Sequence, residues 1–381
     1  MDGRVLTVTT LDSTGPGSLK AAIGARGPRV IVFEVGGVID LAQQTLVIDE
    51  PFVTVAGQTA PHPGITLIRG GVLITTHDVS IRHIRVRPGD AGQPRRSGWE
   101  PDGISTSGRL AYNIVIDHCS VTWGVDENLS ASGPQHAGRA GTSHAITFSN
   151  NIVAEALRRA SHSEGAHSKG SLIHDHVTQV AIIRNLYAHN SDRNPYFKPD
   201  ATGVVANNVI YNPGQVAISM DYVTQEYRGR EDELRPARVS VVGNVLQYGP
   251  NTPFFLALVS GRGEVYLEDN LPLRRNDRAA PRTLGRLSIS DQPPIWVGGI
   301  AVLPGGETLD YVLANAGARP WDRDAVDRRI IESVRAGSGT IIDSQEDVGG
   351  YPDHAMTYRT LEIPESDVES WLASFENAAQ E

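Results

Sequence analysis

The sequence contains a single cysteine, Cys119, among 381 residues. One thiol excludes an internal disulfide and a cysteine-based zinc site, and it leaves the cellular compartment open. Aromatic residues make up only 6% of the chain, and no apolar run is long enough to cross a membrane. The first 280 residues also lack long helical heptads, whereas 39 glycines and 23 prolines interrupt the chain throughout. These absences point away from a membrane partner and from a disulfide framework.

Lysine is also scarce: Lys20, Lys169 and Lys198 are the only three, and the other 31 basic residues are arginines. The formal net charge of −10 argues against a nucleic-acid partner, although a local basic cluster can still face an acidic substrate. We therefore expect a monomer with no nucleic acid and no membrane partner. A β-like run begins directly after Gly3, so we expect no signal peptide within this sequence. A secreted protein expressed without its leader would start in the same way.

Short β-like runs fill residues 4–90. The runs are three to five residues long and are separated by polar turns, a pattern that fits a sandwich, a barrel or a solenoid. Residues 17–23 are the exception, because they predict a short helix with Ser18 near its start. The N-terminal part therefore predicts an all-β fold with one short helix.

Six segments between residues 113 and 271 repeat one pattern, an apolar strand, a polar residue and a second short apolar strand. We interpret them as coils of a solenoid, because such a unit buries its apolar face only by stacking on its neighbours. The alternative is a β-sandwich with asparagine in its loops, but hairpin turns such as Asn-Gly are absent. Stacked asparagines are expected to hydrogen-bond from coil to coil. The repeated polar residues are His118, Asn151, Asn185, Asn208, Asn244 and Asn270.

The sequence pattern changes after about residue 280, where segments with a helical pattern replace the short β-like runs. Helices are predicted over 306–316 and 322–334, with one more over 365–381. A solenoid must cover its open end, so we expect this helical and irregular segment to pack back on the coils. The chain is therefore predicted to be a single domain over 1–381, with coils over about 28–280 and a capping segment over about 281–381.

Two basic residues, Arg193 and Lys198, stand five residues apart between two apparent strands. Fixed cations suit a ligand rich in carboxylates. The alternative is a pair of surface residues that make weak ion pairs with Asp192 and Asp200. Asp117-His118 is a candidate catalytic pair of an acid and an imidazole. It lies inside one of the repeats, which favours a structural role over a catalytic one.

Acidic residues gather on two turns that are expected to lie on adjacent coils: Glu100 and Asp102 on one, Asp126 and Glu127 on the next. Four such carboxylates suit a hard cation such as Ca²⁺, and the alternative is two solvated acidic turns.

A histidine-bearing loop follows these turns in the sequence. His162 and His167 are candidates for metal binding or acid–base chemistry. Their spacing matches no strong zinc signature, so we expect no metal there. Lys169, at the end of the loop, is better suited to hold an acidic substrate.

Several of these segments together resemble the family 1 polysaccharide lyases, the pectate lyases. The motif Arg-x-Pro-x-x-Arg followed by Asn-Asn is similar to residues 193–198 and Asn207-Asn208, and the family's Ile-Asp-His is matched at 116–118. The resemblance extends over most of the chain. Further matching segments are 8–19, 27–33, 56–61, 316–320 and 327–331.

The resemblance implies a right-handed parallel β-helix that cleaves a uronate-containing polysaccharide, pectate first, by Ca²⁺-assisted β-elimination outside the cell or in the periplasm. It implies that Arg193 abstracts the C5 proton and that Lys198 holds a substrate carboxylate. It implies calcium ligands at Asp102 and Asp126, with Glu100 at a neighbouring ligand position. The remaining candidates are Glu127 for the metal, and Lys169, Arg158 and His162 for the substrate.

Three departures from the family pattern bear on the substrate. Lys198 replaces the second motif arginine, and Ser130 stands where a further calcium carboxylate is expected, so that Glu127 is its candidate substitute. A family lysine falls near 156–157, for which Lys169, Arg158 and Arg159 are candidate replacements. A lyase on a different uronan therefore stays open, as do a β-helical glycoside hydrolase, which needs convergent carboxylates, and a non-catalytic carbohydrate-binding solenoid.

Overall fold

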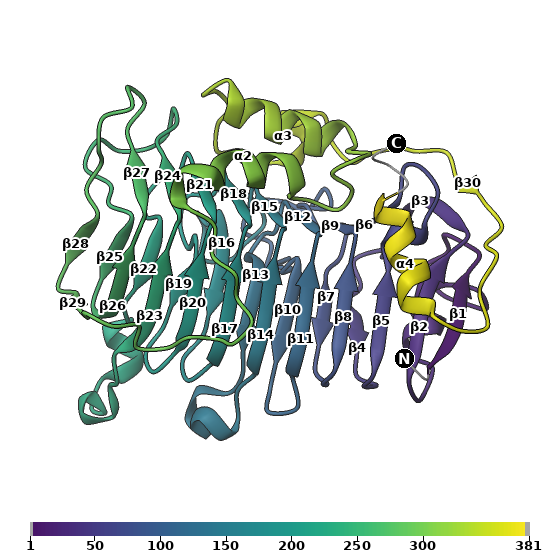
Figure 1. The fold of residues 1–381 in the computed structure, drawn as a ribbon, viewed down its shortest axis with the longest axis horizontal. Helices are drawn as coiled ribbons and strands as arrows, with labels where there is room; N and C mark the ends of the chain where they lie inside the picture. Colours follow the sequence, from purple (N-terminus) through teal and green to yellow (C-terminus); the bar gives the residue numbers. More distant parts are fainter. Residues whose placement is uncertain (1–2, 378–381) are drawn as a thin grey trace.

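The computed structural model describes residues 3–377 as a stack of coils built from three sheets (Figure 1). The chain passes through sheet I, sheet II and sheet III in turn, and each strand pairs in parallel with its counterpart one coil later. The exception is β30 (Thr357–Tyr358), which adds to sheet II in the antiparallel direction. The architecture is therefore a parallel β-helix, as the sequence predicts.

Sheet I contains β1 (Arg4–Val8), β2 (Arg29–Phe33), β5 (Val53–Ala56), β8 (Val79–Arg82), β11 (Tyr112–Asp117), β14 (His144–Ser149), β17 (Thr178–Ile183), β20 (Thr202–Ala206), β23 (Ala237–Val242), β26 (Gly263–Glu268) and β29 (Ser288–Ile289). Sheet II contains β3 (Val35–Asp40), β6 (Ile65–Ile68), β9 (Ile84–Arg87), β12 (Ser120–Thr122), β15 (Ile152–Ala154), β18 (Leu186–Ala188), β21 (Val209–Tyr211), β24 (Val245–Gln247), β27 (Leu271–Leu273) and β30. Sheet III contains β4 (Leu46–Ile48), β7 (Val72–Ile74), β10 (Ile104–Ser107), β13 (Glu127–Ser132), β16 (Lys169–Ile173), β19 (Tyr196–Phe197), β22 (Ile218–Met220), β25 (Val259–Gly261) and β28 (Thr283–Gly285).

The helices lie at the two ends of the chain. The α-helices are α1 (Leu19–Ile23), α2 (Gly305–Asn315), α3 (Ala325–Arg335) and α4 (Val368–Asn377), and the predicted residues beyond 377 lie outside the described part of the chain. Ser18 caps α1, as expected, since its hydroxyl accepts the backbone N–H of Ala21. Short 3₁₀ turns are η1 (Gly57–Thr59), η2 (Gln135–Ala140), η3 (Thr224–Tyr227), η4 (Glu231–Glu233) and η5 (Gln345–Val348).

Apolar residues of successive coils stack in register inside the helix. One column of sheet I runs through Ile116, Phe148, Ile182, Val205 and Val241, and every side chain in it is fully buried. A single coil would expose these side chains to water, whereas stacking buries them, which is the driving force for the solenoid. The parallel columns confirm the solenoid over the sandwich.

A ladder of asparagine side chains runs along the turn between sheets I and II. The Nδ2 of Asn151 donates to Oδ1 of Asn185 at 2.9 Å, and the same bond links Asn185 to Asn208, Asn208 to Asn244 and Asn244 to Asn270 at 2.9 to 3.0 Å. The five side chains are buried, so the ladder satisfies polar groups that water does not reach. The predicted coil-to-coil hydrogen bonds are confirmed.

The predicted position of the ladder is wrong by one residue at its first coil. Cys119, rather than His118, lies in the column, where its backbone N–H donates to Oδ1 of Asn151 at 2.8 Å. His118 takes the preceding position with a left-handed φ of 47°, like Asn150 at 52°, and its ring stacks on His83. Most of these corners have two adjacent residues with polar side chains, and the sequence pattern does not distinguish the one that points inward.

Replacing Asn208 with alanine is expected to destabilise the protein by about 2–4 kcal/mol, because the change removes one rung and leaves buried amides of Asn185 and Asn244 without their partners. The measurement is the chemical-denaturation midpoint, with the exposed residue Asn276 changed to alanine as the control. Equal midpoints for the two variants would contradict a stabilising ladder.

Helices α2 and α3 lie along the outer face of sheet II, beside the coils and not across their open end (Figure 1). Ile152 and Leu186 of sheet II pack in one buried cluster with Val312 of α2 and Ile330 of α3. From β15 to β24 this face of sheet II is apolar and requires cover. The C-terminal segment therefore packs on the coils as expected, but its first two helices cover a side.

A buried ionic cluster fastens α3 to β9. Arg87 contacts Asp324 Oδ2 at 2.6 Å and Asp327 Oδ1 at 2.9 Å, and Arg85 contacts Asp327 Oδ2 at 3.2 Å. Burial alone would raise the pKa of Asp324, but Arg87 and Arg85 outweigh it and hold that pKa well below its ordinary value. The stabilisation from Asp324 is therefore present above the ordinary carboxyl range and is lost only as the pH falls into strong acid.

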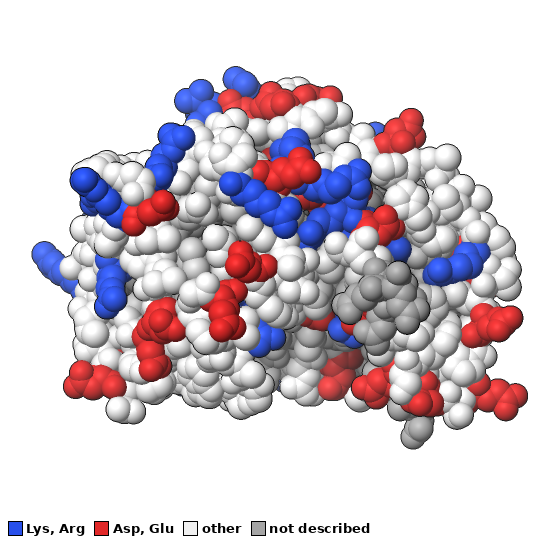
Figure 2. Space-filling model, turned by 45° about the horizontal axis from the view of Figure 1, so that its top comes forward, with Lys and Arg blue, Asp and Glu red and all other residues white. Residues whose placement is uncertain are grey.

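Charge is unevenly distributed over the surface. Figure 2, which brings the top of Figure 1 forward, shows basic side chains gathered near the middle of that face, with acidic side chains among and around them. Five arginines occur within residues 319–335, the segment that includes α3. A net charge of −10 thus coexists with a local basic area. Among residues 3–377, no helix has both the length and the apolar character that a membrane span requires.

Candidate active site

An open groove of about 490 Å³ crosses the outer face of sheet III where β13, β16 and β19 lie side by side. Its walls are loops between strands, which the coils place at fixed positions along the axis. One wall carries Asp102, Asp126 and His162, and the opposite end carries Lys198 and Glu226. The groove therefore brings together acidic, basic and imidazole groups that are far apart in the sequence.

Three carboxylates meet in this groove. Asp102, Asp126 and Glu127 each offer an oxygen, and these oxygens lie within 4.8 Å of one another. Asp102 is fixed by two hydrogen bonds, from the backbone N–H of Glu127 at 3.0 Å and from the hydroxyl of Ser130 at 2.7 Å. Glu100 lies outside this group and faces His162 instead, with 3.7 Å between its Oε2 and the ring Nε2.

The electrostatics of this group favour a bound cation. Burial and the neighbouring charge of Asp126 raise the pKa of Asp102 to about 7, against the hydrogen bond from Ser130. Burial is the larger cause of this shift, and a divalent cation held by the three carboxylates would offset it by favouring their ionised forms. Ca²⁺ prefers oxygen ligands and tolerates irregular coordination geometry, and a group of three carboxylates meets both conditions.

The loop before β19 presents Arg193 to the same carboxylates. Close packing below the loop is possible because Gly170 has no side chain, since a Cβ there would stand 2.5 Å from the carbonyl oxygen of Arg193. Asn190 holds the loop from inside, with its Nδ2 donating to Oδ1 of Asn194 at 3.1 Å and its Oδ1 accepting from Asn128 at 3.3 Å. Arg193 itself has a left-handed backbone, with φ of 58°.

Arg193 is mostly buried and forms an ion pair with Glu127. Its guanidinium lies over the ring of Tyr196, 5.7 Å from the ring centre. Burial lowers the pKa of Arg193 below its ordinary value, while the charge of Asp126 acts in the opposite direction. The site thus contains an arginine with a weakened hold on its proton, next to a carboxylate group that suits a cation.

Two stacked histidines complete the acidic wall. The rings of His162 and His167 lie 3.3 Å apart between centres and 20° from parallel, and both Nε2 atoms face Oδ1 of Asp126 at 3.6 and 3.5 Å. Burial and the nearby charge of Lys169 lower the pKa of His167 to about 4, so this imidazole is neutral at ordinary pH.

Comparison with known proteins decides the family. The "Probable pectate lyase C" of Aspergillus flavus is 32% identical over 364 residues, which span 92% of this chain and 78% of that protein. The protein of the same name from Emericella nidulans is 32% identical over 92% of this chain and 76% of its own length. The chain belongs to the pectate lyase family. It is therefore a polysaccharide lyase. No family model matches the sequence.

Solved structures show the same fold at low sequence identity. Jun a 1, the major allergen from cedar pollen, superposes with a TM-score of 0.58 at 16% identity, over 83% of this chain and 89% of that one. A pectate lyase bound to a hexasaccharide superposes with a TM-score of 0.53 at 13% identity, over 83% and 92% of the two chains. The fold of the lyase is therefore the right-handed parallel β-helix that the resemblance implies.

The basic residues proposed from the sequence occupy different surroundings in the lyase. Lys198 lines the groove but is buried, with its Nζ 3.0 Å from Asp175 Oδ2 and 2.5 Å from Glu226 Oε2. Lys169 pairs in register with Glu127 on the adjacent coil, and burial lowers its pKa. Arg158 forms an ion pair with Asp343 at 2.9 Å, apart from the residues that line the groove.

Sequence reasoning missed the groups that hold these residues in place. Asp175 and Glu226, the partners of Lys198, come from the loop after β16 and from η3. The amide network of Asn128, Asn190 and Asn194 was also missed. Asn128 and Asn190 recur where the chain passes from sheet II to sheet III, just as the main ladder recurs where it passes from sheet I to sheet II. That recurrence was the available signal.

Proposed function

We propose that this protein is a family 1 type pectate lyase that cleaves polygalacturonate by calcium-assisted β-elimination, with Arg193 as the base. The observation that carries the proposal is the position of Arg193 in an open groove beside Asp102, Asp126 and Glu127. A hydrolase would also use convergent carboxylates, but it has no need of a buried arginine beside them. The hexasaccharide held by a pectate lyase of the same fold supports an acidic polysaccharide as the substrate class.

The residues present fit a calcium ion. Asp102, Asp126 and Glu127 would hold it, because their oxygens converge and a bound cation would offset the burial and the charge of Asp126 that raise the pKa of Asp102. Glu100 would approach the ion from the side of Asp126 that faces His162, because both carboxylates lie near Nε2 of that histidine. When bound, the cation would supply charge that acidifies the proton next to a uronate carboxylate.

Arg193 removes the C5 proton in this proposal. A guanidinium is almost always protonated in water, so the base requires surroundings that disfavour its charged form. Burial provides them, and Glu127 opposes them through its ion pair with Arg193. Glu127 is also one of the three candidate cation ligands, so Arg193 loses the partner that holds its proton whenever that carboxylate is engaged elsewhere.

Substrate carboxylates are proposed to bind basic groups along the groove. Lys198 is placed to do so by exchanging Glu226, whose side chain is partly exposed, for a carboxylate of the sugar chain. His162 lines the groove and Lys169 pairs in register with Glu127, whereas Arg158 lies apart from the lining and would have to leave Asp343 to reach a sugar carboxylate. Lys198 binds a carboxylate as a point charge, whereas the family arginine has a planar guanidinium that can form two parallel hydrogen bonds. Because this difference changes how a sugar carboxylate is held, a different uronan is the second candidate substrate.

The size of the substrate bears on where the enzyme acts. A polymer of uronic acids is too large to enter a cell intact, so we expect the enzyme to act outside the cell or in the periplasm, as a monomer.

The test is an elimination assay on polygalacturonate and other uronans, followed by the ultraviolet absorbance of the unsaturated product. We expect absorbance to rise with Ca²⁺, to stop on addition of a chelator and to return with excess Ca²⁺. New reducing ends without this absorbance would indicate hydrolysis, and no product from any uronan would refute the lyase mechanism.

Removing one candidate ligand gives a matched prediction. Asp102→Asn preserves the size of the side chain and can accept one of its two hydrogen bonds, but it removes the charge. We expect at least a tenfold higher Ca²⁺ concentration for half-maximal rate, and Ser107→Ala on β10 serves as the control. An unchanged calcium requirement would exclude Asp102 as a ligand.

A further inference from the structure

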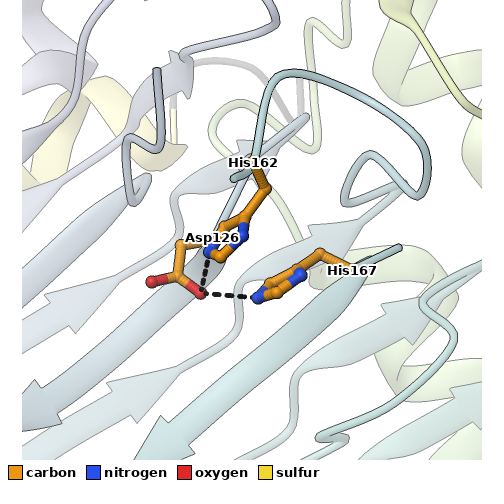
Figure 3. Close-up of side chains that lie close together, drawn as sticks. All are labelled: Asp126, His162 and His167. Atoms are coloured by element: carbon orange, nitrogen blue, oxygen red, sulfur yellow. Dashed lines mark ion pairs between the residues drawn. The ribbon is translucent and has the colours of Figure 1, made fainter. Parts of the chain in front are cut away.

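Two histidines and one aspartate converge on a single point at the acidic wall of the groove (Figure 3). Asp126 comes from the loop between β12 and β13, and His162 and His167 come from the loop between β15 and β16, one coil later. His162 and His167 are more than nine-tenths buried, and the nitrogen atoms that face Asp126 are aimed into the group. The spacing of the two histidines in the sequence matches no zinc motif, so the sequence predicts no metal there. The third group, Asp126, joins them only because one coil stacks on the next.

The distances within this group are too long for hydrogen bonds. Both Nε2 atoms stand 3.5 to 3.6 Å from Oδ1 of Asp126, beyond the ordinary range of about 2.7–3.2 Å for N–H···O bonds. These two distances are close to the edges of a metal polyhedron, and the rings, stacked 3.3 Å apart between centres, must turn apart for both Nε2 lone pairs to point at one ion. Zinc–nitrogen and zinc–oxygen bonds of about 2.0–2.1 Å in a tetrahedron place neighbouring ligand atoms about 3.3–3.4 Å apart.

We propose that Asp126, His162 and His167 bind a divalent transition metal of the zinc class, at a site that shares only Asp126 with the carboxylate group of Asp102, Asp126 and Glu127. Imidazole nitrogen is a ligand for zinc, cobalt and nickel and a poor one for Ca²⁺, which takes oxygen. Glu100, whose Oε2 lies 3.7 Å from Nε2 of His162, is placed to supply a fourth ligand. Asp126 belongs to both groups, so the two sites share one carboxylate.

Metal binding fixes the tautomer of His162. A metal on Nε2 requires the ring proton on Nδ1, which now accepts the backbone N–H of Glu164 at 3.2 Å. That bond is given up on binding, and water replaces it because Ser163 and Glu164 are exposed. In the loaded state the histidine loop is tied to the coil that carries Asp126, so the metal sets the position of this wall of the groove.

The inference goes beyond calcium-assisted elimination and is tested without measuring activity. The full chain is treated with a chelator and titrated with Co²⁺, whose visible absorption bands report nitrogen and oxygen ligands. We expect one Co²⁺ per chain, displaced by equimolar Zn²⁺ and unaffected by a large excess of Ca²⁺. Absence of the bands, or displacement of Co²⁺ by stoichiometric Ca²⁺, would overturn the proposal.

Variants locate the ion. His167→Ala and His162→Ala are each expected to weaken Zn²⁺ binding by at least about 100-fold, because each removes one of three ligands. His174→Ala removes another histidine of the same groove, and Asp102→Asn removes a ligand of the carboxylate group only; both are expected to keep the cobalt spectrum. If His174→Ala lowers the affinity as much as His167→Ala, or if neither His162→Ala nor His167→Ala changes it, the ion binds elsewhere and the proposal fails. Circular dichroism of each metal-free variant checks that a lost signal does not reflect unfolding.

Discussion

Replacing Arg193 with alanine is expected to lower the rate of elimination on polygalacturonate by about 10³-fold or more, because the change removes the proposed base from the groove. The fold should persist, since the loop is held by Asn190, Asn194 and the close packing on Gly170 and not by the guanidinium. The measurement is the initial rate of product absorbance at saturating substrate and Ca²⁺.

A second substitution separates a base from a positioning charge. Lysine has a lower ordinary pKa than arginine, so Arg193→Lys should move the alkaline rise of the pH–rate profile to lower pH if the group at 193 must be neutral to react. The sign follows from the chemistry, because the neutral fraction of a base grows as the pH rises toward its pKa. Burial lowers the pKa of Arg193 already, so the wild-type rate should also rise through the alkaline range.

Arg26→Ala serves as the control for loss of a positive charge. Arg26 is highly exposed, pairs with Glu50 at 3.4 Å and lies before β2, on coils remote from the groove. Its variant should keep the wild-type rate and pH profile. Full activity in Arg193→Ala, or an Arg193→Lys profile with an unmoved alkaline limb, would show that Arg193 is not the base.

The largest loss of stability is expected from Asp327→Ala, at about 3–5 kcal/mol. Asp327 is fully buried and contacts both Arg85 and Arg87, and it also accepts the hydroxyl of Ser120 at 2.7 Å. Removing its carboxylate leaves two buried guanidinium groups with Asp324 as their remaining counter-ion. An uncompensated buried charge costs far more than the loss of the ion pair itself.

The test is the denaturation midpoint at neutral pH, followed by both tryptophan fluorescence and circular dichroism, with Glu332→Ala as the matched control. Glu332 lies on the exposed face of α3, five residues after Asp327, and its removal should change stability by less than about 0.5 kcal/mol. If Asp327→Ala and Glu332→Ala unfold at the same midpoint, the cluster contributes nothing to stability.

Features that recur along the chain were predictable from the sequence. The asparagine ladder is the clearest case, because Asn151 to Asn270 recur at one corner and each repetition supports the same inference. The exception at Cys119 shows the limit of the pattern: it identifies a corner, whereas the residue that points inward depends on a single backbone angle.

Features that depend on pairs of distant residues were not predictable. Lys198 meets Asp175 and Glu226 through loops whose paths carry no periodic signal, and the histidine pair meets Asp126 only because one coil stacks on another. The carboxylates of the groove were predicted to face one another because they lie on two turns of adjacent coils, which the stacking of a solenoid brings together. The side cover by α2 and α3 was not, because the apolar outer face of sheet II becomes visible only after the strands are assigned to sheets.

The cluster at β9 has a consequence for the order in which the chain is made. Arg87 and its partner Asp327 are separated by 240 residues, so the strand that contains Arg87 is synthesised long before its counter-ion. Until α3 is synthesised, Arg85 and Arg87 have no counter-ion with which to be buried. We therefore expect a product truncated before residue 324 to be digested by a protease faster than the full chain.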